Sequence, residues 1–236
     1  MIKSLFINTF SRVALALTAV LAFSPLPSLA EPVANAVLKL EISHDFDTGI
    51  NTKQFESAFA GHVWNDFGLQ FDLGVGKHED FESTSAAGTL HAYVEPAGDL
   101  AYGLFLTSED RRPGNSYFYG AEMAFATPGL NLEGFVAMRD DISASSTGFR
   151  IGGDLTVPLS SVLQMQAGGT YDSGAPLERS YAYIGTRIEV ADGIAISGSI
   201  GQTDQNETIF GVAASITFGR GVPFGRRETF ARYPGY

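Results

Sequence analysis

The sequence predicts an all-β fold: a single antiparallel transmembrane β-barrel of about twelve strands, with ten to fourteen allowed by its weaker strand boundaries. Segments after residue 30 alternate apolar and polar residues with a period of two, which indicates strands with one apolar and one polar face. The apolar faces carry no charged residue at mid-strand, and short turns alternate with longer loops. No stretch after residue 30 reaches eighteen consecutive apolar residues, which excludes a helical membrane protein.

The first thirty residues have the features of a secretory signal peptide. Lys3 and Arg12 are basic, residues 13–23 form an apolar run, and small residues end at Ala30. An apolar run of roughly a dozen residues is too short to cross a ~30 Å hydrocarbon core as a helix. We therefore expect three regions: a signal peptide over 1–30 that is cleaved after Ala30, a transmembrane β-barrel over 31–218, and a basic periplasmic C-terminal tail over 219–236.

The strands follow from the alternation. A tilted strand needs about 9–11 residues to cross a bilayer, and segments such as 36–43, 69–76 and 149–157 alternate over comparable lengths. The predicted strands lie near 36–46, 54–64, 67–78, 84–95, 99–108, 116–126, 130–138, 146–157, 161–171, 179–190, 193–201 and 207–218. An even number of strands suits a closed barrel.

The connections between these strands alternate in length. Tight turns are expected at 65–66, 96–98, 127–129, 158–160 and 191–192, and longer polar loops at 47–53, 78–83, 108–115, 139–145, 172–179 and 202–207. Short periplasmic turns and longer extracellular loops are typical of bacterial membrane barrels, with both termini on the periplasmic side.

The outward face is apolar, with residues such as Leu40, Phe59 and Leu104 at mid-strand. A charge at the lipid-facing midplane would cost about 2–4 kcal/mol, so the absence of such charges supports a bilayer environment. Aromatic residues of the same parity fall near the strand ends and are expected to form two interfacial girdles. They are Phe46, Phe55, Tyr117, Phe149 and Tyr171 near the loops, and Phe67, Phe125 and Phe218 near the turns.

Composition excludes several classes of protein. The formal charge is -11, and removal of the signal peptide makes the mature chain more acidic, at about -13. An acidic surface repels nucleic acid, so no nucleic-acid partner is expected. The chain contains no cysteine, which excludes disulfides and thiol chemistry.

The last predicted strand, 208–218, alternates and ends in the aromatic Phe218. It resembles the closing strand of Gram-negative outer-membrane proteins and small porins, in which the terminal aromatic serves as an assembly signal. The resemblance implies a location in the cell outer membrane, contact with outer-membrane lipid and lipopolysaccharide, and recognition by the outer-membrane assembly machinery. The resemblance is also compatible with a homo-oligomer. Porin-type chains usually stop at this aromatic, whereas this one continues to Tyr236.

A twelve-stranded barrel is wider than an eight-stranded barrel, whose interior side chains can fill, so the inward residues are expected to line a pore. The predicted pore-lining residues are Lys39, Glu41, His62, Asp72, His91, Tyr93, Glu122, Glu133, Arg150, Asp154, Arg187 and Glu189. If the turns set simple registers, Glu122 lies opposite Glu133, with Arg150 beside it. Two interpretations stay open: an acidic constriction with a basic edge, and a hydrogen-bond network that braces the wall.

Metal binding and catalysis find little support in the sequence. His62 and His91 point inward with Asp72 between them, but no His-x-His or His-Glu-x-x-His spacing occurs. The loop from Asp45 to Glu56 superficially resembles a calcium loop, but its glycine, Gly49, is one position early. No Gly-x-Ser-x-Gly signature marks a nucleophile. We therefore predict no metal, no cofactor and no catalytic residue.

The segment after Phe218 is basic and aromatic, with four arginines against the single acid Glu228. Three interpretations of this segment are possible. It is a disordered periplasmic extension, a segment that contacts anionic headgroups, or a partial plug folded back into the acidic lumen. The leading functional prediction is a porin-like channel for passive diffusion of small hydrophilic solutes. The alternatives are a structural or adhesive barrel anchor without a conducting pore and a barrel enzyme that acts on lipid.

Overall fold

Twelve strands account for most of the chain. The computed structural model of the protein describes residues 35–79, 84–96, 98–111, 114–142, 145–174 and 178–233, so the predicted signal peptide and Ala30 lie outside the described residues. The strands are β1 Asn35–Asp45, β2 Asn51–Trp64, β3 Phe67–His78, β4 Thr84–Val94, β5 Leu100–Arg111, β6 Gly114–Thr127, β7 Leu130–Asp141, β8 Ser146–Pro158, β9 Leu163–Ser173, β10 Arg179–Ala191, β11 Ile194–Thr203 and β12 Thr208–Phe218. A four-residue helix, α2 Thr229–Arg232, follows them.

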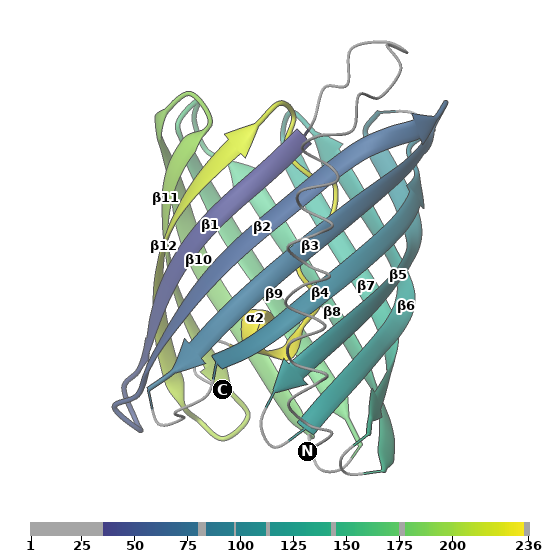
Figure 1. Ribbon diagram of the computed structural model, residues 1–236. Helices are drawn as coiled ribbons and strands as arrows, with labels where there is room; N and C mark the ends of the chain where they lie inside the picture. Colours follow the sequence, from purple (N-terminus) through teal and green to yellow (C-terminus); the bar gives the residue numbers. More distant parts are fainter. Residues whose placement is uncertain are drawn as a thin grey trace. The chain divides into compact units, whose positions relative to one another are not determined.

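The strands form one closed, antiparallel barrel in which each strand pairs with its neighbours in sequence (Figure 1). The ring is closed by β1 and β12, whose register runs from Ala36 opposite Phe218 to Asp45 opposite Ile209. Closure leaves no sheet edge with unpaired backbone groups, which is the condition for crossing a bilayer with strands. The predicted twelve-stranded barrel is confirmed, and Phe218 is the last residue of its closing strand.

The outward face of the barrel is apolar and exposed, as the alternation predicts. Leu40 is 60% exposed, Leu104 is 66% exposed and Ile184 is 60% exposed, which is far from the burial that such side chains have in a water-soluble core. In a membrane barrel this surface is solvated by lipid. None of the helices among the described residues is long and apolar enough to span a membrane.

The connections define two rims. The strand ends at the turn rim are those that join β2 to β3, β4 to β5, β6 to β7, β8 to β9 and β10 to β11. The strand ends at the loop rim are those that join β1 to β2, β3 to β4, β5 to β6, β7 to β8, β9 to β10 and β11 to β12. Strands β5 and β6 reach further toward the loop rim than predicted, so that only 112–113 separate them. Trp64 ends β2 at the turn rim and is 75% exposed.

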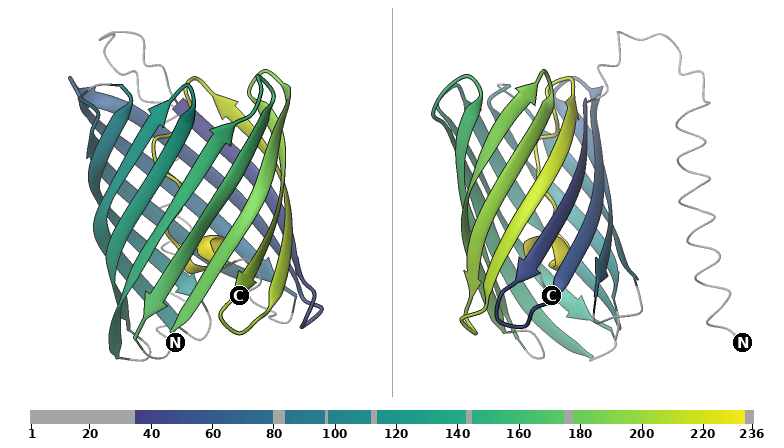
Figure 2. Two further views of the ribbon diagram at one scale, coloured as in Figure 1. Left: turned by 180° about the vertical axis from the view of Figure 1, so that it is seen from behind. Right: turned by 90° about the vertical axis from the view of Figure 1, so that its left-hand side faces the viewer.

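The segment after β12 lies inside the barrel (Figures 1 and 2). We call residues 219–233 the tail. It begins at the turn rim, where the Arg220 backbone N–H donates to the Asn35 side chain at 2.9 Å, and it reaches the loop end of β10, where the Tyr233 hydroxyl donates to the carbonyl of Arg179 at 3.0 Å. The tail therefore crosses the lumen from one rim toward the other.

This location of the tail differs from the predicted periplasmic extension and agrees with the alternative of a partial plug. The physical reason is charge, because the arginines of the tail find carboxylates on the inner wall. An extension into the periplasm would leave these wall carboxylates without their cations.

Aromatic side chains of the tail complete the interior of the barrel. Phe224 packs with Tyr93 and Ala101, and Tyr233 packs with Tyr181 and Ile209. A third cluster, formed by Phe105, Phe118, Phe135 and Ala137, belongs to the wall alone. The lumen is thus partly packed by its own C-terminal segment.

Candidate functional site

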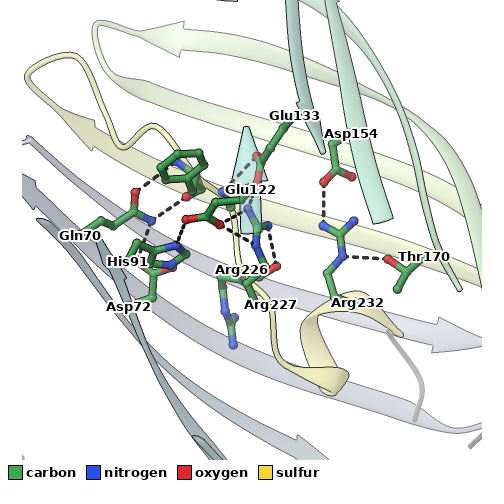
Figure 3. A network of polar contacts seen from close by, with 12 residues as sticks. Gln70, Asp72, His91, Glu122, Glu133, Asp154, Thr170, Arg226, Arg227 and Arg232 are labelled. Atoms are coloured by element: carbon green, nitrogen blue, oxygen red, sulfur yellow. Dashed lines mark hydrogen bonds and ion pairs between the residues drawn. The ribbon is translucent and has the colours of Figure 1, made fainter. Parts of the chain in front are cut away.

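The candidate site is the lumen around the tail, where three tail arginines meet carboxylates of the wall. Figure 3 shows the contacts of Arg227 and Arg232. Arg226 Nη1 lies 2.5 Å from Glu56 Oε1 on β2, and Arg232 Nη1 lies 2.7 Å from Asp154 Oδ2 on β8. Arg227 contacts Glu122 on β6 and Glu133 on β7. A basic tail and an acidic wall therefore neutralise each other inside the barrel.

Arg227 has the most enclosed guanidinium of the three. Its Nε and Nη2 donate to Glu122 Oε2 at 3.0 and 2.7 Å, and Nη2 also donates to Glu133 Oε1. The guanidinium carbon lies 4.4 Å from the ring centre of Phe135 and 5.4 Å from that of Phe105. The side chain has no solvent exposure, so its charge is stabilised by two carboxylates and two aromatic rings instead of by water.

Glu122 is held in place by a chain of hydrogen bonds that runs across the wall. His91 Nδ1 lies 2.7 Å from Glu122 Oε1, and His91 Nε2 lies 3.0 Å from Asp72 Oδ2. Gln70 donates to Asp72 at 2.9 Å. Because both imidazole nitrogens face carboxylate oxygens, the ring can donate to both only when it carries both protons.

The same network anchors the tail backbone. The Gln70 side chain donates to the carbonyl of Phe224 at 2.7 Å and accepts from the Phe224 N–H at 3.1 Å. The Phe224 ring stacks on His91 with ring centres 5.7 Å apart. Recognition of the tail therefore uses backbone, ring and charge together.

A second network lies further along the tail. Arg150 on β8 donates twice to Asp172 on β9, and it also donates to the carbonyl of Arg227 at 2.7 Å and to the Thr229 hydroxyl at 3.0 Å. The Thr229 N–H donates to Glu109 on β5 at 3.1 Å. All these groups are buried.

The predicted registers around Glu122 and Arg150 are wrong. Glu122 lies opposite Phe135, Glu133 lies between Ala124 and Asp154, and Arg150 pairs with Asp172. The reason is the position of the turn: Thr127 is already paired with Leu130, so the connecting residues are 128–129, one position later than a Glu122–Glu133 pair requires. Glu122 and Glu133 do come together, but through Arg227 and not as cross-strand neighbours.

The remaining predicted lining residues divide by location. Lys39 binds Glu41 at 2.6 Å, and Arg187 donates to the Ser215 hydroxyl at 3.0 Å. His62 lies with Glu95, at 3.2 Å, and does not join His91. His62 and Glu189 lie near the turn rim. The other ten predicted residues contact the tail or line the cavities beside it, and they are Lys39, Glu41, Asp72, His91, Tyr93, Glu122, Glu133, Arg150, Asp154 and Arg187.

Two cavities lined by both polar and apolar side chains flank the tail. One, of about 270 Å³, lies between the tail and the wall formed by β1–β3 and β8–β12, with Lys39, Arg187 and Tyr183 among its lining residues. The other, of about 440 Å³, lies at the turn rim, where Glu95 and Arg220 contribute to it. Solvent-sized space therefore remains beside the tail.

No group of three or more His, Cys, Asp or Glu side chains in the described part of the chain is arranged to hold a metal ion. In the loop with the superficial calcium-loop pattern, Asp45 accepts instead from the Asp47 N–H at 2.9 Å and from the Thr48 hydroxyl at 2.6 Å. Gly49 has a positive φ of 76°, which suits a tight connection. This geometry is that of a hairpin turn.

The architecture matches that of solved membrane proteins. A KdgM porin in complex with disordered oligogalacturonate superposes with a TM-score of 0.58 and 11% identity, over 78% of this chain and 99% of that one. A NanC porin superposes with a TM-score of 0.61 and 10% identity, over 77% and 99%. The chain has the fold of outer-membrane porins.

An outer membrane channel from Pseudomonas putida F1 also shares this porin-type barrel, with a TM-score of 0.51 and 9% identity over 83% of this chain and 99% of that one. No protein-family model matches the sequence, and no curated protein matches it. At these identities the shared feature is the fold of an outer-membrane β-barrel. The contacts inside the lumen are those of this chain's own residues.

The specific role of Arg227 was not predicted from the sequence. The signal that could have found it was charge complementarity, since the tail is basic and the inward face is acidic. Three arginines within seven residues, next to aromatic residues, suit a polar interior better than they suit free solvent.

Proposed function

We propose that this porin-type barrel is an outer-membrane channel for passive diffusion of small hydrophilic solutes. The single observation that carries the proposal is the pairing of an exposed outer face that is apolar at mid-strand with a charged lumen that keeps cavities beside the tail. A protein that served only as a membrane-spanning anchor has no need of solvent-sized polar space across its interior. The fold of solved porins supports the same function.

We place the solute path along the cavity lined by Lys39, Glu41 and Arg187. Charges of both signs around it produce a field that orients polar solutes without binding them tightly, which suits diffusion. One solved structure of this fold is a KdgM porin in complex with disordered oligogalacturonate, so a barrel of this fold can bind a hydrophilic oligomer. No cofactor and no reaction enter the proposed function.

Planar-bilayer recording of the purified full-length protein tests the channel. Steady conductance is expected in concentrated KCl, and a tryptophan in the path at Ser199→Trp should reduce it by at least half. The matched control is Ile200→Trp, the next residue on β11, which faces lipid and is 47% exposed. Absence of conductance in repeated insertions, or equal effects of the two tryptophans, would contradict the proposal.

A structural or adhesive anchor is the second candidate, because the tail crosses the lumen and buries its arginines there. An anchor predicts no conductance from the wild type, and none from variants that loosen the tail. An enzyme that acts on lipid is less well supported, since the outward face of the described strands is apolar at mid-strand.

The biogenesis that fits this function includes export by the signal peptide 1–30, recognition of Phe218 by the assembly machinery, and contact of the outer face with lipid and lipopolysaccharide. N-terminal sequencing of the protein purified from membranes tests the first step. A mature chain that starts at Glu31 is expected, and retention of Met1 would contradict cleavage after Ala30.

A further inference from the structure

We propose that the lumen contains a guanidinium-binding site, formed by Glu122, Glu133 and the Phe135 ring, which the chain's own Arg227 fills and which accepts guanidinium-bearing cations when Arg227 is withdrawn. The ligand class is arginine and arginine-containing peptides. The proposal goes beyond passive diffusion, because it gives the channel a specific ligand and makes the tail a built-in competitor for it.

The chemistry of the site selects a guanidinium over other cations. Glu122 accepts from two nitrogens of the Arg227 fork, at 3.0 and 2.7 Å, and Glu133 accepts from a nitrogen on the same edge. The ring of Phe135 lies 4.4 Å from the guanidinium carbon. A planar fork matches carboxylates with several parallel hydrogen bonds and stacks on an aromatic ring, whereas a compact ammonium ion does neither.

The wall holds two of the three groups of this site, Glu122 and Phe135. Glu122 is fixed by His91, which is fixed in turn by Asp72, and these three residues come from β6, β4 and β3. The Phe135 ring packs edge-on against Phe105 with ring centres 6.0 Å apart. Withdrawal of the Arg227 side chain therefore leaves Glu122 and Phe135 in place, and Glu133 keeps its hydrogen bonds from the Gly225 N–H of the tail backbone.

Charge also favours a new cationic occupant. Among the described residues, Glu133 has an ion pair only with Arg227, and its other hydrogen bonds come from the Gly225 N–H. Without Arg227, Glu133 is a carboxylate in a narrow lumen that has lost its ion-pair partner. Such an uncompensated charge is costly, and a guanidinium-bearing cation removes the cost.

A neighbouring arginine extends the same pattern. Arg232 donates to Asp154 at 2.7 Å and to the Thr170 hydroxyl at 2.9 Å, and its guanidinium carbon lies 5.1 Å from the Phe135 ring centre. The Phe135 ring therefore contacts two guanidinium groups. The cavity of about 440 Å³, which Glu133 and Asp154 line, provides room for a small cation to approach.

Vacating the site in the full-length chain tests the proposal. The variant Arg227→Ala is titrated with methylguanidinium chloride by calorimetry in detergent, and methylammonium chloride at equal ionic strength is the competing probe. We expect saturable binding of about one methylguanidinium per barrel, at least tenfold weaker binding of methylammonium, and at least tenfold weaker binding of methylguanidinium to the wild type.

Two further variants identify the binding groups. Arg227→Ala combined with Glu133→Gln should bind methylguanidinium at least tenfold more weakly than Arg227→Ala alone. Arg220→Ala is the matched control, because Arg220 is an exposed tail arginine paired with Glu95 at the turn rim, and it should behave as the wild type. A folded Arg227→Ala barrel without saturable binding would overturn the proposal, as would binding that ignores Glu133→Gln or occurs equally in Arg220→Ala.

If Arg227→Ala folds poorly, refolding itself becomes the measurement. The yield of heat-modifiable barrel should then rise at least threefold with methylguanidinium and not with methylammonium, and equal yields would overturn the proposal. Calorimetry and refolding do not need a conducting pore. Loss of the guanidinium site therefore leaves the channel standing, and absence of conductance leaves the guanidinium site standing.

Discussion

Arg150 and Asp172 are direct neighbours across β8 and β9, and their buried side chains form a two-pronged ion pair, with Nε to Oδ1 at 2.8 Å and Nη2 to Oδ2 at 2.7 Å. The same guanidinium donates to the carbonyl of Arg227 and to the Thr229 hydroxyl. Arg150 thus joins β8 to β9 through Asp172 and also binds the tail. The negative charge of Asp172 compensates the buried guanidinium that makes both sets of contacts.

Replacing that charge tests the pair. In Asp172→Asn, the buried Arg150 loses the carboxylate with which it forms its ion pair, and we expect the free energy of unfolding to fall by about 3–5 kcal/mol. Urea unfolding of the barrel in detergent micelles measures the change. Asp192→Asn is the control, because Asp192 lies exposed in a turn-rim connection, and its effect should stay within about 0.5 kcal/mol. Equal effects of the two substitutions would contradict the assignment.

The position of the tail against the wall also depends on a glycine in the wall. A Cβ added at Gly74 on β3 would overlap Arg226 Nη2 and would lie 2.7 Å from Glu228 Oε1. Both of these atoms belong to the tail, so the tail approaches the wall at Gly74 more closely than any larger residue would permit. A leucine at this position would therefore push Arg226 and Glu228 away from the wall.

We expect Gly74→Leu to loosen the tail and to raise single-channel conductance at least twofold, with larger current noise. The control is Gly61→Leu on β2, where an added Cβ meets nothing within 4 Å. Planar-bilayer recording compares the two variants with the wild type. If Gly74→Leu conducts as Gly61→Leu does, the tail does not limit the path.

The lipid-facing side of the barrel predicts a depth-dependent cost for charge. Leu104 lies in the middle of β5 and is 66% exposed, so Leu104→Lys should lower the free energy of unfolding by about 2–4 kcal/mol. Leu159 is 55% exposed in a turn-rim connection, and Leu159→Lys should cost about 0–1 kcal/mol. Unfolding in lipid vesicles measures both, and equal costs would argue against a bilayer around β5.

The environment of Tyr233 predicts that binding of the tail to the wall depends on pH. Burial, followed by the nearby Asp172 carboxylate, raises the pKa of the Tyr233 hydroxyl above its ordinary value of about 10. Since the folded pKa is the higher one, the contribution of Tyr233 to tail seating is complete below about pH 10 and is lost as the pH rises further. Arg150, Arg232 and Tyr181 also face this ring.

A spin label at Ala231→Cys reports this loss, because the chain has no other cysteine and Ala231 lines the cavity of about 270 Å³. The mobile fraction of the label should stay constant up to about pH 10, the ordinary tyrosine pKa, and should grow as the pH rises above it. In the Tyr233→Phe background the growth should be much smaller. An unchanged profile in that background would assign the effect to wall tyrosines instead.

The fold could be predicted from the sequence because alternation and turn residues are local signals. The predicted bounds of β3, 67–78, coincide with the observed ones, and inward parity placed Glu122, Glu133 and Arg150 on the lumen side. Their partners could not be predicted in the same way. The turn at 128–129 sets the register of every pair between β6 and β7, and the position of Arg227 depends on residues that are distant in sequence.

Trp64, exposed at the turn rim, has a practical consequence, since it is the only tryptophan in the chain. Indole emission from this protein reports on a single location, the boundary between headgroups and hydrocarbon at one end of β2. Insertion into vesicles can therefore be followed in real time by a blue shift of the native fluorescence, with no dye attached. Quenchers placed at defined depths in the lipid would then measure how far that end of the barrel sinks into the bilayer.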